Sequence, residues 1–376
     1  MKIGIVCYPT YGGSGVVATE LGKALAKAGH HIHFVTYSLP TRLDYFNENI
    51  FFHEVTINSY PLFQYPPYEL ALASKLVDVV MYEKLDIIHV HYAIPHASAA
   101  YMAKQILATK GIHIPIVTTL HGTDITLVGQ DPTYEPVVTF SINQSDAVTA
   151  VSNSLRKETY EKFAITKDIE VIHNFIDLKR FSRKPLDHFK LAICPNGEKL
   201  IVHTSNFRKV KRVDDILHVF AGIRKKIQVK LLLVGDGPER QKTEMLCRDL
   251  EIAEDVRFLG KLDAVEEILS VADLFVMTSE KESFGLAALE AMACQVPVIS
   301  TNAGGLPELN IHGETGYMTN VGDIEAMIHY SLLILDPANH PAFKAAALAR
   351  ATLFDITRIL PLYEACYERT LAEVGV

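Results

Sequence analysis

Short apolar runs alternate with helix-periodic segments along this chain, and glycine turns separate them. Near the N-terminus, residues 3–7 form a continuous apolar run that predicts a buried β-strand. Apolar residues then recur on one face of a predicted helix: Val17, Leu21, Ala24, Leu25 and Ala28. Gly29 follows as a helix-terminating glycine, and residues 32–35 predict a second strand. This order, with a glycine-rich first turn, is typical of a βαβ unit.

The same alternation continues toward the C-terminus. Further apolar runs that predict strands lie at residues 86–91, 115–120, 145–151, 169–172, 200–203, 230–234, 255–260, 273–277 and 297–300. A helical segment at residues 97–108 separates two of them. Strands that alternate with helices predict parallel sheets covered on both faces, so the predicted fold class is α/β.

Three other stretches complete this outline. The prolines of residues 61–68 exclude a regular helix, and we expect a surface loop that is either a lid over a substrate or a plain connection. The mixed composition of residues 182–198 predicts a linker. After about residue 357, a final helical segment carries one apolar stripe: Ile359, Leu360, Tyr363, Tyr367 and Leu371.

Length and composition favour two globular domains and disfavour several other classes. The chain has 376 residues, of which 49% are hydrophobic, enough for two cores of ordinary size. Its 36 basic and 44 acidic residues give a net charge of −8, which argues against a nucleic-acid partner. No apolar run reaches about 18 residues, so we expect no membrane span. The five cysteines are scattered without a Cys-x-x-Cys, which favours reduced thiols and a cytoplasmic location.

Polar clusters follow the predicted strands of the first half, at residues 89–92, 121–124 and 152–154. Ligands of open parallel sheets bind at the carboxyl ends of strands, so we expect these clusters to face one crevice. His121 is the strongest candidate, although a histidine satisfied by its own loop is almost as common. The turn formed by Gly13, Ser14 and Gly15 holds a phosphate, lets a substrate approach the backbone, or serves only tight packing. It is not Gly-x-Gly-x-x-Gly, so a dinucleotide site is poorly supported.

The sequence gives little support for a metal or another cofactor. His89 and His91 share one face of a predicted strand and could form a metal pair, but no third ligand is evident. The chain also contains no Asp-x-Asp, the pair suited to a divalent ion on a sugar nucleotide. We therefore expect chemistry without a metal.

The most informative stretch is residues 280–293, where a polar turn leads from a predicted strand into a run of helix formers. Ser283 is a plausible N-cap, and Gly285 would let a ligand approach the backbone. A helix start suits an anion, and Glu282 and Glu290 bracket this one. Their carboxylates can accept two hydroxyl protons from a sugar or ribose. A helix start with acidic residues favoured by the dipole explains the spacing equally well.

A second candidate lies in the turn after residues 200–203. It contains four cations, Arg208, Lys209, Lys211 and Arg212. Such a group could neutralise a departing diphosphate, or it could be a solvated charge run.

Residues 282–293, Glu-Ser-Phe-Gly-Leu-Ala-Ala-Leu-Glu-Ala-Met-Ala, closely resemble the signature of retaining glycosyltransferases of the GT-B architecture, family 4 type. The resemblance implies two Rossmann-like domains whose parallel sheets face an interdomain cleft. Residues 1–175 would form the acceptor domain and residues 176–358 the nucleotide-sugar donor domain. Residues 172–181 resemble the family's hinge, and residues 359–376 would form a helix that crosses back to the first domain.

The same resemblance assigns roles to individual residues. It implies that Glu290 binds the nucleotide ribose and that Glu282, Lys211 and His121 are the catalytic groups, with His121 reaching the donor sugar. In the family's basic motif, Asn206 stands in place of an arginine and Lys211 is the motif's lysine, so either Asn206 or Arg208 contacts the diphosphate beside Lys211. The complete donor-binding set is Gly13, Ser14, Gly15, Asn206, Arg208, Lys211, Ser283, Phe284, Gly285 and Glu290.

Three segments narrow the resemblance to a subgroup: residues 7–22, 121–126 and 205–212. Members of that subgroup transfer N-acetylglucosamine from UDP-N-acetylglucosamine to the hydroxyl of L-malate, at the start of bacillithiol synthesis. No carboxylate is a confident nucleophile for double displacement. The resemblance instead implies front-face attack, in which the leaving phosphate takes the malate proton. Arg42, Tyr92 and Thr119 lie in loops suited to binding the malate dianion.

Other functions stay open at this stage. A related hexosyltransferase could act on a lipid or glycan acceptor, an epimerase could turn over the donor without malate, and a sensor could bind the donor without chemistry. The sequence does not determine whether the chain forms a homo-oligomer.

Overall fold

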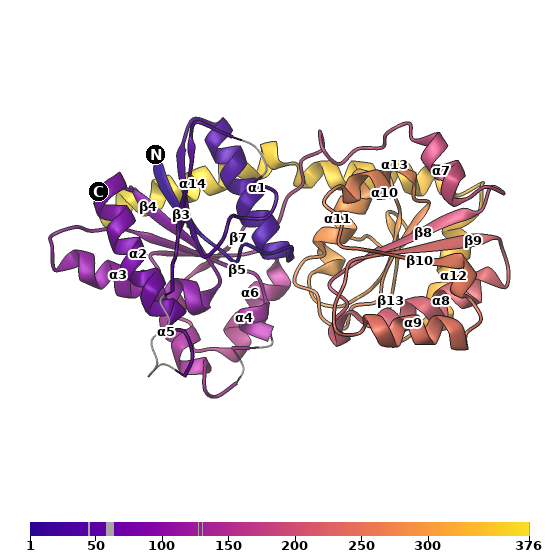
Figure 1. The fold of residues 1–376 in the computed structure, drawn as a ribbon, viewed down its shortest axis with the longest axis horizontal. Helices are drawn as coiled ribbons and strands as arrows, with labels where there is room; N and C mark the ends of the chain where they lie inside the picture. The colour runs from indigo at the N-terminus through magenta and orange to yellow at the C-terminus, as the bar shows by residue number, and fades with distance from the viewer. Residues whose placement is uncertain (44–45, 58–63, 127, 130, 376) are drawn as a thin grey trace. The chain divides into compact units, whose positions relative to one another are not determined.

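The chain forms two compact units in a computed structural model that describes residues 1–43, 46–57, 64–126, 128–129 and 131–375 (Figure 1). Unit 1 comprises Met1–Asn174 and Ile356–Val376, and unit 2 comprises Phe175–Asp355. We expected the divisions after residues 175 and 358. Residues 61–63 of the expected loop lie outside the described part of the chain.

Unit 1 is built on a parallel sheet of seven strands in the order β3-β2-β1-β4-β5-β6-β7. The strands are β1 (Lys2–Val6), β2 (His31–Thr36), β3 (Ile50–Glu54), β4 (Ile87–His91), β5 (Ile116–Leu120), β6 (Ala147–Ala150) and β7 (Ile169–Val171). Its helices include α1 (Gly13–Lys27), α2 (Tyr68–Glu83), α3 (Ser98–Ala108), α4 (Thr123–Thr126), α5 (Glu135–Gln144), α6 (Asn153–Lys162) and α14 (Ile356–Val374). Helices cover both faces of the sheet, which explains why the central strands β4 and β5 are buried throughout.

Unit 2 repeats this plan with six parallel strands in the order β10-β9-β8-β11-β12-β13. The strands are β8 (Lys199–Thr204), β9 (Val229–Val234), β10 (Val256–Gly260), β11 (Leu274–Met277), β12 (Val298–Thr301) and β13 (Gly316–Thr319). The helices are α7 (Asp187–Ile193), α8 (Val213–Arg224), α9 (Arg240–Asp249), α10 (Val265–Val271), α11 (Leu286–Ala293), α12 (Ile324–Leu335) and α13 (His340–Ala351). Both units are therefore Rossmann-like, as predicted.

Each predicted strand is present, with ends shifted by one or two residues. Two strands were missed. β3 is an edge strand whose residues are all at least partly exposed, so it lacks a buried apolar run. β13 has only four residues, too few to form a distinct apolar run. The prediction of a linker at residues 182–198 was wrong where α7 forms a short helix within unit 2.

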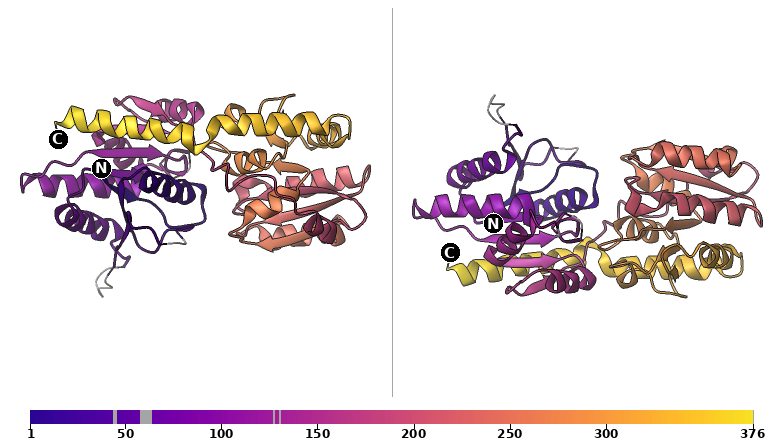
Figure 2. Two further views of the ribbon diagram at one scale, coloured as in Figure 1. Left: turned by 90° about the horizontal axis from the view of Figure 1, so that it is seen from above. Right: turned by 90° about the horizontal axis from the view of Figure 1, so that it is seen from below.

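The C-terminal helix α14 belongs to unit 1 and lies along it, as the yellow helix that ends at the C mark in Figure 2 shows. Its buried face comprises Ile359, Tyr363, Cys366, Tyr367 and Thr370. This confirms three of the five predicted stripe positions, whereas Leu360 and Leu371 are partly exposed. No helix among the described residues is long and apolar enough to cross a membrane.

In each unit the strand order reverses beside the first strand, between β1 and β4 in unit 1 and between β8 and β11 in unit 2. Loops leave such a switch point in opposite directions, and the gap between them is where doubly wound folds bind ligands. The turns after β1 and β4 carry Ser14 and Tyr92, and those after β8 and β11 carry Lys211 and Glu282. The fold thus brings these four predicted site residues to the switch points of their units, whereas Arg42 follows β2, Thr119 and His121 lie in and after β5, and Glu290 lies in α11 (Leu286–Ala293).

Candidate active site

In unit 1, buried histidines gather at the ends of β4 and β5. His121 follows β5 and is 8% exposed, and its Nε2 shares a 2.7 Å hydrogen bond with Nδ1 of His91. Burial, with a smaller contribution from His96, lowers the pKa of His121 to about 3. His121 is therefore a neutral imidazole at neutral pH, able to donate or accept a hydrogen bond but not to supply a positive charge.

His89 anchors this group to the C-terminal helix. Its Nδ1 lies 2.8 Å from the Tyr367 hydroxyl, and its Nε2 lies 2.7 Å from the Thr119 hydroxyl, which in turn contacts Thr149 at 2.7 Å. Both ring nitrogens of His89 are hydrogen-bonded, so neither is available to bind a metal together with His91. Thr119 is fully buried, which favours a supporting role over direct contact with malate.

The turn after β4 meets the glycine turn after β1. The Tyr92 hydroxyl donates a 2.8 Å hydrogen bond to Oγ of Ser14, and the rings of Tyr92 and His121 lie 5.4 Å apart. Gly15 is required by packing, because a Cβ there would lie 2.4 Å from the Tyr8 carbonyl oxygen. Gly13 is the exposed first residue of α1, where backbone N–H groups without helical partners suit an anion.

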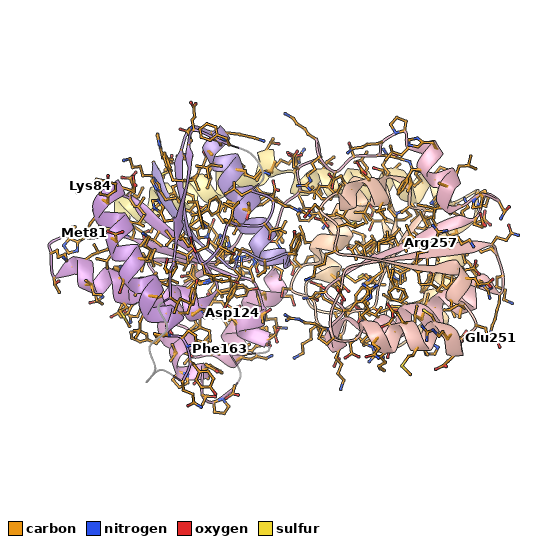
Figure 3. The ribbon with its side chains drawn as sticks, viewed as in Figure 1. Met81, Lys84, Asp124, Phe163, Glu251 and Arg257 are labelled. Carbon is orange, nitrogen blue, oxygen red and sulfur yellow. The ribbon has the colours of Figure 1, made fainter. Side chains whose placement is uncertain are left out.

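Asp124, labelled in Figure 3, is a buried carboxylate that sequence reasoning left out of the site. Its Oδ2 accepts a 2.8 Å hydrogen bond from the backbone N–H of Ala93, and Oδ1 accepts a 3.2 Å bond from Gly122. Burial raises its pKa to about 6 despite these donors. Asp124 ties the His121 turn to the Tyr92 turn, and a polar residue three positions after His121 was the available signal.

Arg42 lies in the turn after β2, in the left-handed backbone region with φ of 68°. Its carbonyl oxygen accepts a 3.1 Å hydrogen bond from Nζ of Lys23, a residue of α1. The backbone of Arg42 is thus fixed against the helix that starts with Gly13.

In unit 2, Lys211 and Glu282 form an ion pair, with Nζ 2.6 Å from Oε2. Their side chains are 19% and 15% exposed, so solvent screens the pair only in part. The Thr278 hydroxyl, at the end of β11, donates 2.9 Å bonds to the carbonyl oxygens of Lys211 and Arg212. The fold therefore joins the two predicted catalytic groups of this unit.

The turn that carries Glu282 is held by a glycine pair from the next loop. The Gly305 N–H donates a 2.9 Å bond to the Glu282 carbonyl, and a Cβ on Gly304 would lie only 1.9 Å from that oxygen. Ser283 is not the N-cap of α11, contrary to expectation. Gly285 takes that position with φ of 102°, a conformation that glycine adopts without strain, and the helix begins one residue later.

The helix that follows positions the second carboxylate. Glu290 lies within α11 and is 6% exposed. Burial of the Cys294 thiol, and then the negative charge of Glu290, raise the pKa of Cys294 to about 12. Phe284 is 1% exposed and packs edge-on against Phe354 at 5.4 Å. Phe284 is thus a core residue, so that only its backbone is suited to contact a ligand.

The basic turn after β8 splits into fixed and exposed cations. Arg212 binds Asp215, with Nε 2.6 Å from Oδ2. Arg208 is an exposed cation, and the neutral side chain of Asn206 beside it is exposed too. Gly237 brings the turn after β9 close to them, because a Cβ there would lie 2.7 Å from the Phe207 carbonyl oxygen. Lys211 is therefore held in place, while Arg208 is free to move toward a ligand.

Comparison with known proteins identifies the family. Residues 11–180 match the family model described as Glycosyltransferase Family 4, and residues 185–345 match that described as Glycosyl transferases group 1. The chain is 54% identical over 336 residues to the N-acetyl-alpha-D-glucosaminyl L-malate synthase of Bacillus anthracis. The aligned region covers 89% of this chain and 87% of that protein. It is also 29% identical over 337 residues to an uncharacterised glycosyltransferase of Methanocaldococcus jannaschii, with 84% of each chain covered.

Solved structures share the fold at lower identity. The sucrose-phosphate synthase of Thermosynechococcus elongatus superposes with a TM-score of 0.81 and 22% identity over 99% of this chain and 100% of that chain. HepE of Anabaena, crystallised with UDP and glucose, gives a TM-score of 0.82 and 22% identity over 98% and 99% of the two chains. The chain therefore has the GT-B fold and belongs to the glycosyltransferase family that includes the N-acetyl-alpha-D-glucosaminyl L-malate synthase of Bacillus anthracis.

Proposed function

We propose that this protein is a retaining hexosyltransferase that moves N-acetylglucosamine from UDP-N-acetylglucosamine to the hydroxyl of L-malate, the first step of bacillithiol biosynthesis. The observation that carries this proposal is the 54% identity to the Bacillus anthracis synthase over nearly nine-tenths of the chain. At that level, the donor, the acceptor and the reaction are expected to be shared. The five free cysteines are all buried, which fits a cytoplasmic location.

The donor would bind at the switch point of unit 2. As the bond between sugar and diphosphate breaks, negative charge grows on the diphosphate oxygens, and Lys211 and Arg208 can approach it as cations. Lys211 is already placed by its 2.6 Å contact with Glu282, so little side-chain freedom remains to be lost. Glu290, buried on α11, is suited to accept hydrogen bonds from the ribose hydroxyls.

The switch point of unit 1 would supply the remaining groups. A neutral His121 can hydrogen-bond a sugar hydroxyl without adding a positive charge next to the oxocarbenium-like centre. The N–H groups at the start of α1 offer donors to the malate carboxylates, and Tyr92 can do so by giving up its hydrogen bond to Ser14. We further propose that no metal is required, because protein cations are available for the diphosphate charge.

Incubation of the protein with UDP-N-acetylglucosamine and L-malate, followed by mass spectrometry, tests the proposal. We expect a malate glycoside and stoichiometric UDP, undiminished by EDTA. Reactions without malate, and with Glu282→Gln, are the controls. Donor turnover that does not depend on malate would point to an epimerase, and transfer only to lipid or glycan would replace the proposed acceptor.

A further inference from the structure

A second group of metal-ligating side chains lies in unit 1, away from the residues discussed so far. It consists of His33 on β2, His53 on β3 and Glu83, the last residue of α2. One ligand atom from each lies within 4.8 Å of the others. Figure 3 labels Met81 and Lys84, which mark this end of α2, and shows them well separated from Asp124 in the same unit.

The sheet register explains why the two histidines meet. β2 and β3 are parallel neighbours in which Val35 pairs with His53 and His33 pairs with Phe51. Side chains two apart on a strand share a face, so His33 and His53 point to the same side of the sheet. Val35 belongs to the same hydrophobic cluster as Leu76 and Val80 of α2, and the last residue of that helix, Glu83, lies beside both rings.

The contact between the rings is unusually suited to a metal. Nδ1 of His33 lies 2.9 Å from Nε2 of His53, and the rings stack at 5.2 Å. Two imidazole nitrogens at that distance must share one proton. Tetrahedral Zn²⁺ with Zn–N bonds of about 2.0–2.1 Å separates two nitrogen ligands by about 3.4 Å, so only a small opening of this pair is needed.

Charges of both signs surround the group, with Glu83 and Asp78 opposed by Lys2 and Lys75. His33 is buried and His53 is partly buried, and burial disfavours a positive charge on either ring. Glu83 supplies a negative charge near His53. Lys75 pairs with Asp78 at 3.4 Å, whereas Lys2 donates to the neutral Glu83 carbonyl at 2.7 Å and keeps its positive charge, so the case for a metal rests on the geometry of the three ligand atoms.

We propose that His33, His53 and Glu83 bind one Zn²⁺ ion through two imidazole nitrogens and one carboxylate, with water at the fourth position. The ion would tie the edge strand β3 to the C-terminal end of α2. An edge strand has a ladder partner on one side only, so this link would stabilise the weakest strand of the sheet. The site is independent of the proposed glycosyl transfer.

Titration of the EDTA-treated, desalted full-length protein with Zn²⁺ by calorimetry tests this proposal, and Co²⁺ absorption reports tetrahedral ligation. We expect one tight site per chain. His53→Ala and the isosteric Glu83→Gln should each weaken it by at least 10–100-fold, since loss of a ligand costs more than loss of an outer-shell partner. His31→Ala is the matched control, because His31 lies on β2, the strand that carries His33, and is exposed.

Circular dichroism confirms that each variant is folded before titration. Retention of the site by His31→Ala and its loss in both ligand variants support the proposal. It is overturned if the wild-type protein binds no Zn²⁺, or if Glu83→Gln binds it as tightly as the wild-type protein does.

Discussion

Gly304 offers a way to move the catalytic turn without removing any of its functional groups. Its φ of 56° lies in the left-handed region, where a Cβ costs about 1–2 kcal/mol. In Gly304→Ala the new Cβ would also lie 1.9 Å from the Glu282 carbonyl oxygen, whereas ordinary contact begins at 3.4 Å. The obstacle is backbone, so the Glu282 turn must retreat by roughly the difference, 3.4 − 1.9 = 1.5 Å.

A misplacement of about 1 Å can lower a rate by about 100-fold, so we expect kcat/KM of Gly304→Ala to fall by at least that factor. Gly313→Ala is the matched control in the same unit. Gly313 has φ of 81°, but a Cβ there meets nothing within 4 Å. That variant should therefore pay the conformational cost alone and keep its turnover.

Both variants are compared by malate-dependent UDP release and by urea unfolding. We expect Gly304→Ala to be about 1–3 kcal/mol less stable than Gly313→Ala, the usual cost of forced overpacking. If folded Gly304→Ala turns over as fast as Gly313→Ala, the geometry of the Glu282 turn does not limit catalysis, and the reasoning fails.

Three further predictions concern charge and protonation. Lys211→Ala should lower kcat by about 100-fold or more in the UDP-release assay. Lys209 is an exposed cation of the same turn, and Lys209→Ala should leave kcat unchanged. Equal losses in the two variants would contradict a specific role for Lys211. Burial lowers the pKa of His203 to about 4, against about 6.5 when unfolded. Below pH 6.5 only the unfolded state takes up this proton, so stability present above pH 6.5 is lost as the pH falls toward 4. The wild-type protein should therefore lose about 2 kcal/mol more of its unfolding free energy between pH 7 and pH 5 than His203→Gln does. Equal losses in the two proteins would refute the assignment. Because burial also lowers the pKa of His121 to about 3, the kcat/KM profiles of the wild-type enzyme and His121→Asn should run parallel from pH 5 to pH 8; a ratio that changes near pH 6.5 would show that His121 titrates there.

Individual residues show where sequence reasoning reached its limit. The mostly apolar runs identified the central strands because those strands are buried on both faces. The same signal failed for β3, which is partly exposed at every position, and for α7, which has no clear apolar period. Ser283 had the composition of an N-cap, but the backbone at Gly285 adopts the conformation that only glycine takes without strain.

The sequence by itself determined the α/β class, the two-unit repeat and the motif at residues 282–293, because these follow from local burial patterns and from contiguous residues. Only the tertiary structure decided which side chains meet. Lys211 reaches Glu282 across 71 positions, and His89 reaches Tyr367 across 278. A local pattern reports whether a residue is buried but not what it touches, since its partners are set by strand order and by the packing of distant helices.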